Sequence, residues 1–181
     1  MGPGSVDLTS GAYTLEAADV SIPAPGGGLS VRRSYDSRHL TAGIEGPLGP
    51  QWSGLGLGGV QSMTKLPTGS MLLTVANGRQ LVFAKEGTNF LAPPGDSSMT
   101  LKEEGTNTFI LTEQNGTVTT FTLPSGGSGT LFTPSAREEP GSAGAVKYTF
   151  QTVNGITEPT EALAPAPAGS TARPWSRGAA R

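Results

Sequence analysis

The sequence predicts an all-β fold in which antiparallel hairpins stack as a partial β shell or sandwich, and three observations support this prediction. The 181 residues include 27 Gly and 15 Pro, which would interrupt helices at short intervals. Short segments rich in Thr, Val and Leu alternate apolar and polar side chains, which is the two-residue period of a strand. Asn-Gly pairs join such segments, and this dipeptide is the strongest local signal of a hairpin turn.

The first strand is expected over residues 13–22. The apolar residues up to Ala17 share one face, whereas Val20 and Ile22 alternate in the opposite phase. A strand can change phase only where it contains an extra residue. We therefore predict a β-bulge or a break near Ala18-Asp19.

A second strand is expected over residues 29–36, after a glycine-rich turn. Arg33 lies on its apolar face together with Tyr35, while Asp36 lies on the other face. A buried arginine needs a carboxylate or several carbonyl oxygens as partners. We expect the stem of Arg33 to pack near the edge of the core and its charged end to stay in water.

Residues 37–50 are expected to form a loop, which ends in the rigid turn Gly46-Pro47-Leu48-Gly49-Pro50. Trp52 follows directly, and a large ring after a rigid turn is typical of a residue that closes one end of a core. Residues 52–65 carry apolar residues among glycines, which indicates a Gly-rich strand or a pair of short strands.

A hairpin pattern then recurs along the chain. Residues 72–83 match residues 110–121 without gaps at an offset of 38, with turns at Asn77-Gly78 and Asn115-Gly116. A weaker third copy spans residues 148–155. Both residues of each Asn-Gly turn are expected to take positive φ. The near-constant period suggests stacked units, each of which cannot cover its apolar face alone.

These elements divide the chain into three expected regions. Residues 1–12 form an N-terminal arm, and residues 13–157 form the β domain with its hairpin repeats. Residues 158–181 form a Pro/Ala/Arg-rich tail with four prolines and no strand pattern. We expect little fixed structure in this tail.

The composition excludes several classes of function. With no Cys and one His, the chain cannot build a Cys/His zinc site, a disulfide scaffold or a thiol catalyst, and we expect no metal or cofactor. A net charge of −2 provides no basic excess for nucleic acid. The longest apolar runs have only a few residues, so we expect no membrane span.

A glycine pattern at Gly54, Gly56 and Gly59 has the spacing of a dinucleotide-binding loop. Such a loop needs a helix after it, whose N-terminus holds the pyrophosphate. Pro67 would stop any helix here, and no βαβ unit surrounds the motif. Backbone packing in a Gly-rich strand explains the glycines more simply.

An acid–base pair could be formed by Asp36 and His39, with Ser34 or Ser37 as nucleophile. Nucleophilic catalysis also needs a group that orients the base and a site that stabilises the oxyanion. The sequence shows no signature of either. We therefore expect no enzyme, and a solvated histidine at this position.

Three stretches resemble a known family. The first is Asp19-Val20-Ser21-Ile22-Pro23, which leads into the second, Leu29-Ser30-Val31-Arg32-Arg33-Ser34-Tyr35-Asp36-Ser37-Arg38. The third is Gly46-Pro47-Leu48-Gly49-Pro50-Gln51-Trp52-Ser53. Together with the hairpin repeats they resemble the N-terminal entry domain of RHS/YD-repeat proteins, over roughly residues 5–169. Gln51 departs from the family pattern, which often has Gly before the Trp.

The resemblance implies a structural role. Proteins of this family are large, mostly exported or surface-associated, and their hairpins wind into a hollow β shell that in many members encloses a C-terminal toxin. The entry domain helps to start or plug the shell and brings no catalytic residues. The positions carried over as structural, with the hairpin turns, are Arg33, Tyr35, Asp36, Gly46, Pro47, Gly49, Trp52, Asn77, Gly78, Asn115 and Gly116.

We therefore expect a non-catalytic structural module, a fragment of a secreted or cell-surface protein whose downstream RHS repeats are its partners. No signal peptide is visible at Met1-Gly2-Pro3-Gly4. Without the next repeat, open strand edges would make the isolated chain marginally stable or lead to self-association. The alternative is a self-sufficient β-sandwich module that binds carbohydrate or a surface.

The end of the chain departs from the family. After Gly169, related chains continue with a Cys-Ser-Pro-type stretch, whereas residues 170–181 here do not. Shifting the frame of GC-rich codons can restore that stretch, so we hypothesise that these residues are a frameshifted or truncated end. The nucleotide sequence read in all three frames tests this hypothesis.

Overall fold

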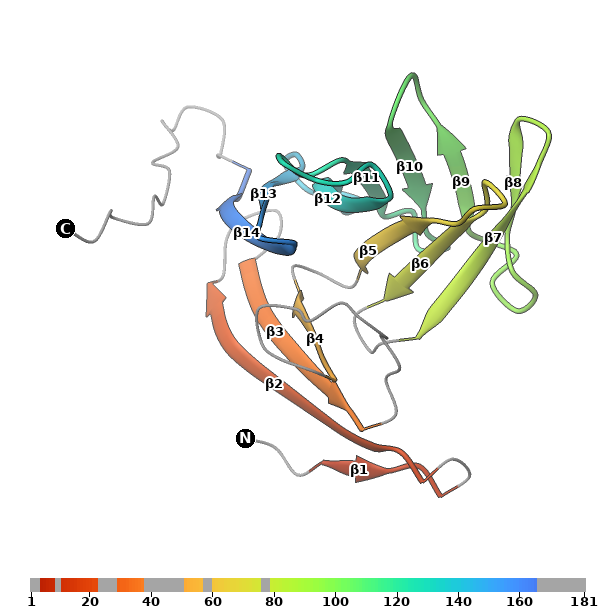
Figure 1. The fold of residues 1–181 in the computed structure, drawn as a ribbon. Helices are drawn as coiled ribbons and strands as arrows, with labels where there is room; N and C mark the ends of the chain where they lie inside the picture. Colours follow the sequence, from red (N-terminus) through yellow and green to blue (C-terminus); the bar gives the residue numbers. More distant parts are fainter. Residues whose placement is uncertain are drawn as a thin grey trace.

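The computed structural model describes residues 4–8, 11–22, 29–37, 51–56, 60–75 and 79–165, which form β-strands joined by turns (Figure 1). Every ladder between these strands is antiparallel, so the predicted all-β fold is confirmed. The strands are β1 (Ser5–Val6), β2 (Tyr13–Ile22), β3 (Leu29–Asp36), β4 (Trp52–Gly56), β5 (Val60–Lys65), β6 (Met71–Val75), β7 (Gln80–Glu86), β8 (Asn89–Leu91), β9 (Thr100–Glu103), β10 (Thr108–Thr112), β11 (Val118–Thr122), β12 (Leu131–Glu138), β13 (Val146–Val153) and β14 (Ile156–Leu163).

A small sheet has the order β1-β2-β3-β4. The strands predicted over residues 13–22 and 29–36 are present with these bounds. Their register shifts between Ala18 and Val20, where the phase change in the sequence predicted a bulge. The segment that starts at Trp52 forms two short strands, β4 in this sheet and β5 in the next.

The larger sheet curls into a nearly closed barrel. Its strands follow the order β8-β7-β6-β5-β12-β11-β10-β9, and its two ends, β8 and β9, lie next to each other without a ladder between them (Figure 1). Lys85 of β7 reaches across this seam to Glu103 of β9, with 3.5 Å between Nζ and Oε2. The barrel thus has one unpaired seam along an otherwise continuous wall.

The barrel is a duplicated four-stranded meander, and the offset of 38 in the sequence marks the duplication. Strands β5–β7 correspond to β9–β11, because Met63 lies opposite Leu73 as Leu101 lies opposite Leu111. The corresponding buried positions of the two halves are Met63 and Leu101, Met71 and Phe109, Leu73 and Leu111, Leu81 and Thr119, and Phe83 and Phe121. The first two hairpins therefore contribute to one common core within the barrel.

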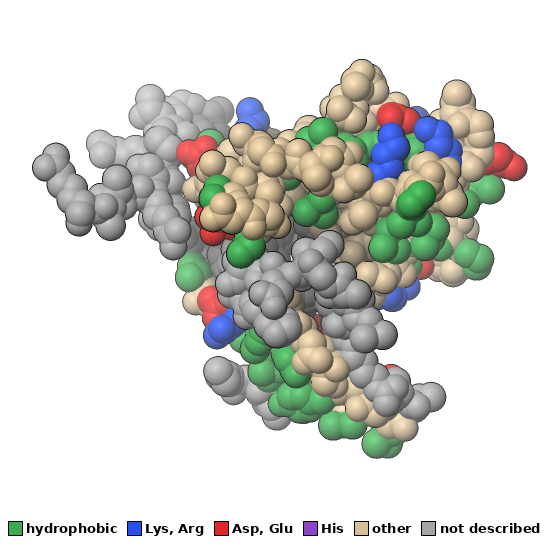
Figure 2. Space-filling model, viewed as in Figure 1, with side chains coloured by type: hydrophobic (Ala, Val, Ile, Leu, Met, Phe, Trp, Pro, Cys, Tyr) green, Lys and Arg blue, Asp and Glu red, His purple; other side chains and the backbone are tan. Residues whose placement is uncertain are grey.

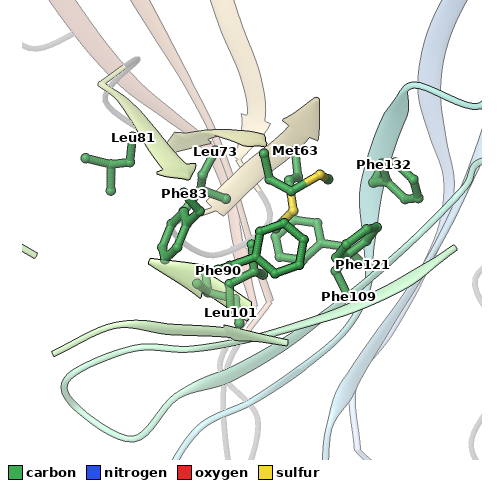
Figure 3. Close-up of a cluster of buried hydrophobic side chains, with 11 residues drawn as sticks. Met63, Leu73, Leu81, Phe83, Phe90, Leu101, Phe109, Phe121 and Phe132 are labelled. Atoms are coloured by element: carbon green, nitrogen blue, oxygen red, sulfur yellow. The ribbon is translucent and has the colours of Figure 1, made fainter. Parts of the chain in front are cut away.

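Apolar side chains from both halves fill the barrel (Figure 3). Phe109 packs edge-on against Phe90 and Phe132, with ring centroids 5.9 and 4.9 Å apart. Phe132 also lies opposite Met63, where β12 joins β5. Each fully buried side chain of this size stabilises the fold by about 1.5–3 kcal/mol, so this cluster is the main source of stability.

The third hairpin, β13–β14, lies outside the barrel wall. It pairs with β12 only through Ala136–Lys147 and Arg137–Val146. The tail was expected to begin at residue 158, but this is wrong, because β14 continues to Leu163. Pro159 hid the strand pattern, yet proline is compatible with an edge strand. The tail beyond residue 165, with the hypothesised frameshift, lies outside the described residues.

Candidate functional site

Three aromatic rings lie on neighbouring strands of the small sheet. Tyr35 of β3 is paired with Trp52 of β4, and their ring centroids are 5.3 Å apart. Tyr13 of β2 lies on the other side of Tyr35 at 6.3 Å. Two residues that the sequence singled out separately, Tyr35 and Trp52, therefore belong to one cluster, which we call the aromatic cluster.

Trp52 was expected to close one end of a core. The structure places it instead in the small sheet, apart from the cluster of side chains that fills the barrel. The reason is the pairing of β4 with β3, which brings Trp52 against Tyr35 before the chain enters the barrel at β5.

Arg33 packs against the Trp52 ring of this cluster. Its guanidinium carbon lies 5.3 Å from the centroid of the Trp52 ring, which is cation–π geometry. Its Nη2 lies 3.1 Å from Oδ1 of Asp19, and its side chain is 31 % exposed. Of the two kinds of partner expected for Arg33, a carboxylate or several carbonyl oxygens, the structure shows the carboxylate, and the side chain is partly exposed as predicted. Asp19 lies at the register shift of β2, so the bulge presents the carboxylate to Arg33.

Gln51 links the aromatic cluster to the end of β3. The Tyr35 hydroxyl hydrogen-bonds the Gln51 Oε1 atom at 2.6 Å, and the Gln51 side-chain amide donates to the Ser37 carbonyl oxygen at 3.1 Å. The backbone of Gln51 has φ of 66°, a region that favours glycine. A glycine would suit this backbone, and Gln51 offsets the strain with two hydrogen bonds.

Asp36 and Ser37, two of the residues considered for acid–base chemistry, take part in hydrogen bonds with the backbone of neighbouring segments. The amide of Asp36 donates to the Gln51 carbonyl oxygen at 3.1 Å, and Ser37 Oγ accepts a hydrogen bond from the Tyr13 amide at 2.8 Å. Ser34 is buried in β3. His39 lies outside the described residues, as do Gly46, Pro47, Gly49, Asn77 and Gly78.

The rings of the aromatic cluster do not form a flat platform. The rings of Tyr13 and Trp52 are tilted by 56° and 59° from that of Tyr35, so they share no plane on which a sugar ring could stack. Arg33 covers Trp52, and Gln51 binds the hydroxyl of Tyr35. The cluster therefore fastens β2, β3 and β4 to one another.

The Asn-Gly turns differ from one another. At Asn115-Gly116 only Gly116 has positive φ. The Glu113 amide donates to the Thr117 carbonyl oxygen, and the Glu113 carbonyl oxygen accepts from the Gly116 amide, which closes a three-residue loop. The prediction of two positive φ angles is therefore wrong at Asn115, because the extra loop residue moves the left-handed position to the glycine alone. It is correct at Asn154-Gly155, where φ is 54° and 81°.

The glycine pattern does not lead into a helix. Gly54 and Gly56 lie in or at the end of β4, and the strand β5 follows from Val60. A pyrophosphate site of the dinucleotide type needs a helix N-terminus at that place. Gly59 lies outside the described residues. The described part of the motif agrees with packing in a glycine-containing strand.

A group of ion pairs around the partly buried Arg137, which the sequence did not reveal, lies at the junction of the barrel and the third hairpin. Arg137 Nη1 is 3.7 Å from Glu113 Oε1, and Arg137 Nε is 3.6 Å from Glu139 Oε1. Tyr148 of β13 is buried nearby, and burial raises its pKa to about 12, partly opposed by the charge of Arg137. Only the long-range pairing of β12 with β11 and β13 brings these groups together, so local sequence patterns could not indicate it.

The described residues contain no group of three or more His, Cys, Asp or Glu side chains placed to hold a metal ion. Among the same residues, no helix has the length and apolar character needed to cross a membrane.

Comparison with known proteins finds a family model that matches part of the chain. No curated protein matches the sequence. Residues 4–83 match the family model of a domain of unknown function, DUF6531. This segment contains the small sheet with its aromatic cluster and the first three barrel strands, and it ends at Phe83 in β7. The matched segment therefore ends within the first half of the barrel.

Proposed function

We propose that the chain is a non-catalytic structural module, the entry segment of a larger RHS-type β shell that is secreted or displayed on the cell surface. The open edge of β14 carries this proposal, because among the described strands β14 pairs only with β13. Downstream hairpin repeats of the longer protein are the expected partners, and they would continue the sheet from this edge.

Backbone hydrogen bonds show which groups of β14 face the open edge. The Thr152 amide donates to the Ser125 carbonyl oxygen, and the Phe150 carbonyl oxygen accepts from the Ser125 amide, so both residues point away from β14. In an antiparallel ladder, two residues opposite each other either both direct their backbone N–H and C=O groups toward the partner strand or both direct them away from it. Thr157, the partner of Thr152, therefore directs its amide away from β13 and toward the open edge.

The small sheet supports the same proposal. Val6 lies opposite Tyr13 in the ladder of β1 and β2, and both are exposed, as are Leu8 and Val20. Hydrophobic side chains gather in the lower part of the view in Figure 2, over the strands that Figure 1 labels β1 and β2. An apolar surface of this kind is typical of a contact with another part of a larger protein.

Hydrogen exchange along β14 tests the proposal. In the 181-residue chain, the Thr157 amide should exchange quickly, whereas the neighbouring Glu158 amide, which faces β13, should be protected and serves as the internal control. In the longer gene product with its repeats, protection of the Thr157 amide should rise strongly. Equal exchange of this amide in both proteins would contradict the proposal.

A further inference from the structure

Pro159 lies in the middle of the open edge of β14. It pairs with Phe150, whose carbonyl oxygen points away from β14 toward Ser125, so the backbone of Pro159 also points away from β13. At this position any other residue would offer an amide donor to an incoming strand. Proline has none, so a strand added at this edge loses a hydrogen bond at its centre.

The next residue interrupts the edge a second time. Thr149 pairs with Glu161 and Phe150 pairs with Pro159, so Thr160 is an extra residue in β14. The hydroxyl of Thr160 turns back to the carbonyl oxygen of Thr149 at 3.2 Å. A bulge bends the strand and breaks the regular alternation of outward-facing groups, which a straight partner strand requires.

Charge adds a third obstacle that acts on copies of this chain. A symmetric antiparallel pair of β14 strands has its centre between Pro159 and Thr160, and it would place Glu158 of one copy opposite Glu161 of the other. Because the pair is symmetric, this contact between Glu158 and Glu161 would occur twice. Like charges directly opposite each other in a ladder are destabilising.

We propose that Pro159, the Thr160 bulge and the two glutamates together protect the β14 edge from pairing with a second copy of this chain. In natural sheets, proline, bulges and charged residues likewise prevent edge strands from pairing with other chains. The protection is directed at separate molecules. A strand from the same polypeptide has a much higher effective concentration and tolerates a missing hydrogen bond, a point that rests on the function proposed above.

The variant Pro159→Thr tests the protection, because threonine restores the amide and fits a half-exposed strand position. Pro67→Thr is the matched control, since Pro67 is exposed in the turn between β5 and β6. Sedimentation equilibrium of the 181-residue chain should show that Pro159→Thr dimerises with a dissociation constant about tenfold or more below that of the original chain, because a symmetric pair gains two hydrogen bonds. Pro67→Thr should match the original chain.

Hydrogen exchange at the new amide of position 159 gives a local readout. This amide should exchange quickly in dilute solution and become protected as the protein concentration rises, with the circular dichroism spectrum showing that the variant is folded. The proposal is overturned if Pro159→Thr associates no more than Pro67→Thr, or if it associates while the amide at 159 stays unprotected. Protection of the Thr157 amide by self-association of the original chain would overturn it as well.

Discussion

Leu81 and Thr119 occupy corresponding positions in the two halves of the barrel, and the Thr119 hydroxyl has no hydrogen-bond partner there. Both side chains are buried, with 6 % and 1 % of their surface exposed. A buried hydroxyl without a partner loses its hydration and gains nothing in exchange. At this position the second half of the barrel therefore buries an unpaired hydroxyl, whereas the first half buries an apolar side chain.

Replacing Thr119 with valine should stabilise the protein. Thr119→Val keeps the shape of the side chain and removes the unpaired hydroxyl, so the free energy of unfolding should rise by about 1 kcal/mol. Urea denaturation measures the change. Thr120→Val, on the half-buried opposite face of β11, is the control and should stay within about 0.5 kcal/mol of the original chain. Destabilisation by Thr119→Val would contradict the assignment.

Two variants of Gln51 should separate backbone strain from hydrogen bonding. Gln51→Ala loses both side-chain hydrogen bonds and keeps a positive φ, so it should lower the free energy of unfolding by about 1–2 kcal/mol. Gln51→Gly loses the same bonds but relieves about 1 kcal/mol of backbone strain, and should lie closer to the original chain. Chemical denaturation of the three proteins gives the order. Equal stability of the alanine and glycine variants would show that the strain is absent.

Gly126 and Gly129 form a matched pair for a steric prediction. Both have positive φ, of 77° and 85°, but a Cβ at Gly126 would lie 2.8 Å from the Thr152 carbonyl oxygen, whereas a Cβ at Gly129 would meet nothing within 4 Å. Gly129→Ala should cost about 1 kcal/mol from the backbone alone. Gly126→Ala should cost at least about 1 kcal/mol more, because Thr152 is held to Ser125 by a 2.8 Å hydrogen bond. Similar melting temperatures for both variants would contradict this close approach.

Tyr148 should make the protein less stable in alkali. Burial raises its pKa in the folded protein to about 12, from 10 in the unfolded chain. Between pH 10 and 12 the unfolded state has lost the proton that the folded state keeps, so stability falls as the pH rises through this window. The loss reaches up to about 2.7 kcal/mol for a shift of this size.

The variant Tyr148→Phe isolates this contribution, since it removes the titrating group and leaves the other tyrosines and lysines in place. Its stability should fall less steeply than that of the original chain above pH 10, and the two curves should be parallel at neutral pH. Denaturation midpoints measured at several pH values provide both curves. Parallel curves throughout the alkaline range would show that Tyr148 titrates normally.

Local features of the fold could be predicted from the sequence. The phase change near Ala18 located the bulge, because side-chain direction in a strand depends only on counting residues. The need of Arg33 for a carboxylate was equally local, and Asp19 meets it from the neighbouring strand. The offset of 38 identified the hairpins, whose equivalent residues prove to be equivalent core positions.

Features that depend on distant partners were missed. Nothing in the local pattern of β5 or β12 indicates that these strands pair and join the two halves into a barrel. The Asn-Gly dipeptide marks a turn but does not determine its loop length, which the strand register sets at Asn115. The strand beyond Pro159 was read as tail, because the pattern of a protected edge differs from that of a buried strand.

The seam between β8 and β9 gives the barrel a preferred line of rupture. The two halves meet twice, once through backbone bonds between β12 and β5 and once through side chains alone, such as Lys85 with Glu103. Local opening of the barrel, whether thermal or under mechanical force, should therefore begin between β8 and β9. Water would then reach Phe90 and Leu101 before any other part of the interior.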